Sequence, residues 1–128
     1  MQRTIRVLLL EDHASFRQAL TRTLEREPDF KVVAQAGTLA EARRRLRMYG
    51  VSQIDVAVLD LLLPDGIGME LVGELRETYP DVAVLVVTVV GDREVHNWAA
   101  ALGADEVVSK DEPFERIVAA IGNLGIRL

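Results

Sequence analysis

Residues 56–66 read VAVLDLLLPDG, an apolar run that passes through a single carboxylate, Asp60, into a turn. The run from Val56 to Leu59 is apolar at every position, which is typical of a strand covered on both faces. Pro64-Asp65-Gly66 is typical of a tight turn. A carboxylate at the end of a buried strand is unfavourable unless a charged or coordinating group meets it. Asp60 therefore indicates a functional site at this strand end.

Polar residues also follow three of the other apolar runs of the chain. Glu11 and Asp12 follow the first run, Thr88 ends the fourth and Lys110 follows the fifth. In order, these strand ends carry an acid pair, the acid Asp60, a hydroxyl and an amine. This order indicates one site rather than scattered surface charge.

The apolar runs alternate with segments of helical period, as expected for a parallel α/β protein. The weakest helix is the one expected at 91–102, because Gly-Asp opens the segment and its centre is rich in alanine. Five strand–helix units predict a single doubly wound parallel sheet, in which ligands bind at the carboxyl ends of the strands where the strand order reverses. The expected strands are 5–10, 30–36, 54–59, 82–88 and 106–109.

Composition and charge narrow the class of protein. The chain has 128 residues, of which 49% are hydrophobic and 27% charged, and this length favours one domain. Its net charge of −5 argues against a nucleic-acid-binding surface on this domain. The absence of cysteine excludes disulfides and zinc-thiolate sites, and the apolar runs are too short to cross a membrane. We expect a soluble cytoplasmic domain with no membrane contact.

The three acids predict a metal site. Two carboxylates about 4 Å apart repel by roughly 4 kcal/mol at an effective dielectric constant near 20, and a divalent cation removes this repulsion. Oxygen ligands with room for water suit Mg²⁺. We expect Asp12 and Asp60 to bind the ion directly and Glu11 to bind it through water. The backbone carbonyl of Leu62 is a further candidate ligand.

A lysine and a hydroxyl beside a magnesium site point to phosphate chemistry. Lys110 offers a compact positive charge, and Thr88 offers a hydrogen-bond donor to a phosphoryl oxygen. Asp60 is the best nucleophile candidate, because a carboxylate can accept a phosphoryl group as an aspartyl phosphate. Phosphoryl transfer needs mainly positioning and neutralisation of charge, which a metal ion and a lysine supply.

The chain resembles the receiver domain of two-component response regulators over nearly its whole length. The motifs that carry the resemblance are LEDH at 10–13, LDLLLPDGIG at 59–68, VT at 87–88, GAD at 103–105 and Lys110. The resemblance implies a CheY-like, flavodoxin-like (βα)5 fold with strand order 2-1-3-4-5. It also implies transfer of a phosphoryl group to Asp60 from a histidine kinase or phosphotransfer protein, with Mg²⁺ held by Glu11, Asp12 and Asp60.

Two details look most like the NarL/FixJ, or LuxR-type, subfamily: Asp111 follows Lys110, and the turn reads Asp-Gly-Ile-Gly. Such proteins usually carry a helix-turn-helix domain that binds DNA. Residues 1–128 are therefore expected to be either a receiver on its own or the N-terminal part of a longer transcription regulator. The expected output surface comprises the helix at 91–102, the strand at 106–109 and the last helix, and this surface is a candidate homodimer interface.

Two positions depart from the family pattern. Val107 stands where receivers usually carry an aromatic residue, so inward rotation of an aromatic ring is excluded as the output of this domain. Val89 stands where a small residue usually follows the hydroxyl. We expect Val89 to narrow access to Asp60 and to slow phosphorylation, dephosphorylation or both.

Two other functions compete with a phosphorylation switch. A receiver-like interaction module that works without phosphorylation is the first, and the intact set of acids, hydroxyl and lysine counts against it. A magnesium-dependent phosphatase is the second. Haloacid-dehalogenase-type phosphatases need an aspartate two residues after the nucleophile, where this chain has Leu62, so an enzyme acting on external substrates is disfavoured.

Other conspicuous residues have ordinary interpretations. His13 beside the acid pair is expected to be exposed rather than to bind metal. The arginines in 43–47 are expected to form a solvated helix face. Gly66 and Gly68 favour a tight turn over a phosphate cradle. Trp98 is a candidate partner contact if exposed, although packing is the more ordinary interpretation.

Overall fold

The computed structural model describes residues 4–49, 53–89 and 91–126. Within these ranges the helices are α1 (Ala14–Glu25), α2 (Leu39–Tyr49), α3 (Met69–Thr78), α4 (Arg93–Leu102) and α5 (Phe114–Gly125). The strands are β1 (Ile5–Leu10), β2 (Phe30–Ala36), β3 (Val56–Leu59), β4 (Leu62–Leu63), β5 (Gly66–Ile67), β6 (Ala83–Thr88) and β7 (Glu106–Ser109). None of these helices is both long and apolar enough to cross a bilayer.

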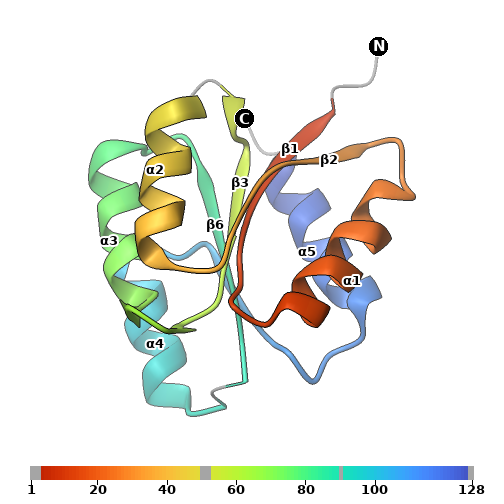
Figure 1. The fold of residues 1–128 in the computed structure, drawn as a ribbon. Helices are drawn as coiled ribbons and strands as arrows, with labels where there is room; N and C mark the ends of the chain where they lie inside the picture. The colour runs from red at the N-terminus through yellow and green to blue at the C-terminus, as the bar shows by residue number, and fades with distance from the viewer. Residues whose placement is uncertain (1–3, 50–52, 90, 127–128) are drawn as a thin grey trace.

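Five strands form one parallel sheet in the order β2-β1-β3-β6-β7. Since β4 and β5 pair only with each other, this order is the predicted 2-1-3-4-5, and the CheY-like fold is confirmed. Helices α1 and α5 cover one face of the sheet, and α2, α3 and α4 cover the other (Figure 1). The strand order reverses between β1 and β3, which places a ligand crevice at their carboxyl ends.

The apolar runs are buried because each central strand packs helices on both faces. In β1, Val7 and Leu9 lie in the same core as residues of α1 and α5, whereas Leu8 and Leu10 lie in the core under α2 and α3. Every residue of β3 is buried. A strand of this kind has no solvent face, which explains why its sequence shows no apolar–polar alternation.

Helix α4 forms where the sequence pattern was weakest. The Asp92 side chain accepts a hydrogen bond of 2.8 Å from the backbone N–H of Glu94, which caps the first turn. Gly103 ends the helix in the left-handed conformation, with φ of 116°. Trp98 on this helix is 51% exposed, so it is available as a partner contact.

The loop after β3 contains a short hairpin where the sequence predicted only a turn. Leu62 pairs with Ile67 and Leu63 with Gly66, forming a short antiparallel hairpin. At its tip, the Asp65 carboxylate accepts hydrogen bonds from the backbone N–H groups of Leu39 at 2.8 Å and Ala40 at 3.0 Å. Asp65 therefore caps α2 from a distant part of the chain, and these hydrogen bonds lower the pKa of Asp65.

The four arginines of helix α2 differ in exposure, and Arg45 is half-buried rather than solvated as predicted. Arg44 and Arg47 are exposed, as predicted for a solvated face. Arg43 instead reaches α3, where its guanidinium donates two hydrogen bonds to Glu74 at 2.5 and 3.0 Å and lies 3.5 Å from Glu70. The Arg43–Glu74 ion pair connects α2 to α3 at the surface.

Candidate functional site

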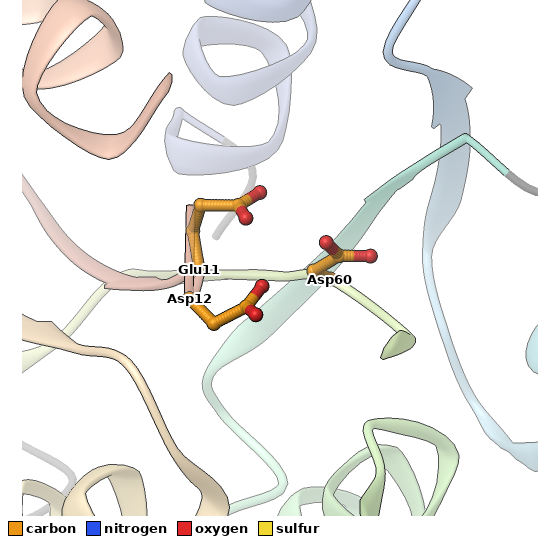
Figure 2. A group of neighbouring side chains, drawn as sticks. All are labelled: Glu11, Asp12 and Asp60. Carbon is orange, nitrogen blue, oxygen red and sulfur yellow. The ribbon is translucent and has the colours of Figure 1, made fainter. Parts of the chain in front are cut away.

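The acids meet at the carboxyl edge of the sheet because the backbone ladder continues past the strands. The N–H of Asp60 donates to the carbonyl of Leu10 at 3.0 Å, and the N–H of Glu11 donates to the carbonyl of Ala36 at 2.9 Å. Figure 2 shows the carboxyl groups of Glu11, Asp12 and Asp60 gathered at this edge. One carboxylate oxygen from each acid lies within 4.8 Å of the others.

The three acids differ in burial. Glu11 is only 2% exposed and Asp60 only 4% exposed, whereas Asp12 is exposed. Two carboxylates are thus withdrawn from water, and the third lies at the rim. Such an arrangement needs cations or hydrogen-bond donors to remain ionised.

Lys110 places a positive charge between two of these acids. Its ammonium Nζ lies 2.5 Å from Glu11 Oε1 and 2.8 Å from Asp60 Oδ2. The backbone brings Lys110 there, because its N–H donates to the Thr88 carbonyl at 2.9 Å and so extends the pairing of β6 with β7. One ammonium therefore bridges two buried carboxylates from different strands.

Backbone amides contact the remaining carboxylate oxygens. Glu11 Oε2 accepts a hydrogen bond from the N–H of His13 at 2.9 Å. Asp60 Oδ1 accepts one from the N–H of Leu62 at 3.2 Å. Each buried carboxylate is thus held at both oxygens, which fixes the orientation of its plane.

The pKa values of the bridged pair reflect competing effects. Burial raises the pKa of Glu11, and this effect outweighs the hydrogen bonds from Lys110 and His13 that lower it. Burial lowers the pKa of Lys110, but the hydrogen bonds to Asp60 and Glu11 and the negative charges of these two acids together outweigh burial and raise it above the ordinary value. Lys110 therefore carries its positive charge throughout the physiological range.

The other predicted residues surround this centre. Thr88 is fully buried at the end of β6, and Val89 beyond it is 58% exposed. Leu62 is exposed on the hairpin. Val107 is half-buried and packs against the core under α2, α3 and α4, where receivers usually place an aromatic ring.

The sequence did not indicate two neighbours of the site. The ring of Phe16 lies under the Lys110 ammonium, with 4.7 Å from Nζ to the ring centroid. Arg17 Nη1 donates a hydrogen bond of 2.5 Å to the Glu11 carbonyl. Phe16 was visible only as one apolar position of helical period, and nothing in its spacing connected it to Lys110. His13 is exposed, as predicted, and its backbone N–H donates a hydrogen bond to Glu11.

The donor set fits a hard divalent cation. All three side chains offer carboxylate oxygens, the ligands that Mg²⁺ and Ca²⁺ prefer, and Asp12 leaves one side open to solvent. Three carboxylates face one ammonium, so the cluster retains net negative charge. A divalent cation would offset that charge.

The fold and the acid cluster define a doubly wound α/β protein of the CheY-like class, with its site at the carboxyl ends of β1 and β3. The chain belongs to the response regulator receiver domain family, which matches residues 7–122.

Its relatives support the subfamily resemblance. The chain is 36% identical over 121 residues to the DNA-binding transcriptional activator DevR/DosR of Mycobacterium tuberculosis, covering 94% of this chain and 54% of that protein. It therefore spans about half the length of the curated relatives it matches.

Solved structures resemble it over most of its length. The signal receiver domain of the response regulator NarL from Mycobacterium tuberculosis superposes with a TM-score of 0.88 at 25% identity, covering 98% of this chain and 99% of that one. A Burkholderia pseudomallei response regulator with a phosphorylated aspartic acid, calcium ion and citrate gives 0.77 at 29% identity, covering 91% of this chain and 66% of that one.

Proposed function

We propose that this domain is a phosphorylation-controlled switch that accepts a phosphoryl group on Asp60 from a histidine kinase or phosphotransfer protein. The single observation that carries the proposal is the meeting of Asp60, two further acids and Lys110 at one sheet edge, in a chain of the receiver family. The domain would be the phosphoacceptor rather than an enzyme acting on external substrates.

The chemistry would be a single displacement at phosphorus. A carboxylate oxygen of Asp60 forms the new O–P bond while the P–N bond of the donor phosphohistidine breaks, and the imidazole leaves with the bonding electrons. Lys110 already lies 2.8 Å from Asp60, so its positive charge faces the oxygens of an incoming phosphoryl group. Thr88, buried at the end of β6, is the candidate hydroxyl donor to one of those oxygens.

Glu11, Asp12, Asp60 and the backbone carbonyl of Leu62 are the residues that would hold Mg²⁺. When bound, the ion supplies positive charge that offsets the repulsion between these carboxylates and the phosphoryl oxygens. Lys110 cannot provide all of that charge, since the cluster has three carboxylates and its single ammonium contacts Glu11 and Asp60.

The output would be a change in the surface formed by α4, β7 and α5. Trp98 is half-exposed on α4 and is a candidate contact of a homodimer or effector domain there. By analogy with the DNA-binding relatives, the domain would act in the cytoplasm and control transcription through an output domain beyond residue 128. Val89 would limit access to Asp60.

Phosphorylation with acetyl phosphate and Mg²⁺, followed by intact mass, tests the proposal. One added phosphate is expected in the wild type and in Asp65→Asn, which changes an exposed aspartate of the neighbouring hairpin. No adduct is expected in Asp60→Asn or with EDTA. Failure of the wild type to gain phosphate, and to bind beryllofluoride, would contradict the proposal and favour an interaction module that works without phosphorylation.

A further inference from the structure

Lys110 has a third contact besides the two carboxylates. Its ammonium lies over the ring of Phe16, with 4.7 Å between Nζ and the ring centroid, while Glu11 and Asp60 hold it from the sheet. The side chain of Lys110 is only 12% exposed. The ammonium is thus held between a pair of acids and an aromatic face.

The Phe16 ring is itself held in place. It lies on α1 and meets the ring of Phe114, the first residue of α5, edge to face, with centroids 5.4 Å apart and an interplanar angle of 83°. This is the geometry that aromatic pairs prefer. Phe16 also packs against the core shared by α1, α5 and the sheet, so its ring is backed by apolar side chains.

An aromatic face at this position has a specific effect on a lysine. The ring quadrupole attracts an ammonium, and the attraction grows as water is excluded. Lysine is otherwise a point charge on a flexible four-carbon stem, so a third contact restricts the position of its ammonium beyond what the two carboxylates do. An aliphatic side chain of similar size would fill the space at Phe16 without attracting the charge.

We propose that Phe16 is a positioning residue that holds the Lys110 ammonium beside Asp60, so that the charge is in place when a phosphoryl group arrives. This inference rests on the proposed function, because it assigns Phe16 a part in phosphoryl binding through Lys110. Phe16 contacts Lys110, and a less firmly held ammonium competes less with a cation for Glu11 and Asp60, so loss of Phe16 weakens binding of a phosphoryl group without weakening binding of Mg²⁺.

The wild-type protein offers a direct spectroscopic test. The sequence contains two lysines, Lys31 and Lys110, so a sample labelled with ¹³C-lysine gives two sets of Cε signals. Lys31 is exposed and serves as an internal reference. A proton over an aromatic face is shielded, so the Lys110 Cε protons are expected upfield of those of Lys31. Coincident signals would overturn the proposal without any variant.

Three variants test the consequence for ligand binding. Beryllofluoride affinity is measured by ¹⁹F NMR in saturating Mg²⁺, and Mg²⁺ affinity by calorimetry. Phe16→Leu is expected to weaken beryllofluoride binding about three- to tenfold, the range of a largely desolvated cation–π contact, with no loss of Mg²⁺ affinity. Phe16→Tyr keeps an aromatic face and is expected to bind like the wild type.

Phe30→Leu is the matched control, because Phe30 packs against the same core and begins β2, away from the acids. It is expected to bind both ligands normally. Equal beryllofluoride affinity in Phe16→Leu and wild type, or an equal loss in Phe16→Leu and Phe16→Tyr, would overturn the proposal. If the wild type itself bound no beryllofluoride, the proposed function would fail, and the lysine signals would still decide whether Phe16 holds Lys110.

Discussion

The charge balance of the acid cluster leads to a prediction for Asp12→Asn. This substitution keeps the shape of the side chain and removes one negative charge from the rim of the cluster. Without metal it is expected to stabilise the domain, because Asp12 repels two buried carboxylates. In Mg²⁺ the variant should be no more stable than the wild type, because it has lost a charged ligand of the ion.

The magnitude follows from the distances. At 4.8 Å, a like-charge pair is worth about 0.9 kcal/mol at a dielectric constant of 80 and about 3.5 kcal/mol at 20. Asp12 is exposed, so the lower figure applies, and two such pairs give roughly 2 kcal/mol. Attraction to Lys110 offsets part of this, leaving a net gain of about 1 kcal/mol, or roughly 3–5 °C in Tm for a domain of this size.

Thermal unfolding in EDTA and in Mg²⁺ measures both effects. Wild-type protein in Mg²⁺ at ten times its Kd is expected to gain about 1.4 kcal/mol by mass action. Asp12→Asn is expected to gain less at the same concentration. Asp81→Asn is the matched control, because Asp81 is an exposed aspartate between α3 and β6, and it should change neither Tm nor the response to Mg²⁺.

Two results would refute the reasoning. If Asp12→Asn melted at or below the wild-type temperature in EDTA, repulsion at Asp12 would not destabilise the domain. If the variant gained as much from Mg²⁺ as the wild type, Asp12 would not be a ligand of the ion.

Three further predictions concern access to Asp60, capping of α2 and backbone strain at Gly103. Val89→Ala is expected to speed phosphorylation by acetyl phosphate, dephosphorylation or both, and unchanged rates in both directions would contradict the access role. Asp65→Asn should lower the urea midpoint at pH 7. The hydrogen bonds to α2 lower the pKa of Asp65 in the folded state, so its stabilisation is present above the unfolded value of about 3.9 and is lost as pH falls through the folded value. The difference from wild type should therefore shrink at pH 3, and an equal difference at both pH values would oppose this explanation. Gly103→Ala should destabilise by about 1–2 kcal/mol, because φ there is 116° and a Cβ would overlap the Arg76 side chain. Gly73→Ala, within α3 where a Cβ meets nothing within 4 Å, should instead be neutral or stabilising in the same denaturation assay.

Three features of the fold were predicted only in part or not at all: the start of α4, the β4–β5 hairpin and the capping of α2. Gly91-Asp92 weakened the helical pattern when it was interpreted as part of the helix, but Asp92 is the cap and the helix begins at Arg93. The hairpin of β4 and β5 was predicted only as a turn, because strands of two residues leave no periodicity. The capping of α2 by Asp65 was not predictable from spacing, since the two lie 26 residues apart at Leu39.

The sequence by itself determined the strands, their parallel arrangement and the polar residues that end them. It could do so because burial on both faces leaves an unbroken apolar run, and a carboxylate or lysine after such a run stands out against it. Only the tertiary structure decided which of these groups touch. That Lys110 bridges Glu11 and Asp60, and that Phe16 lies beneath it, depends on the order of strands in the sheet and on the packing of α1 against α5. Contacts between segments 50 or more residues apart leave no periodicity in a single sequence, whereas each strand and helix carries its own local pattern.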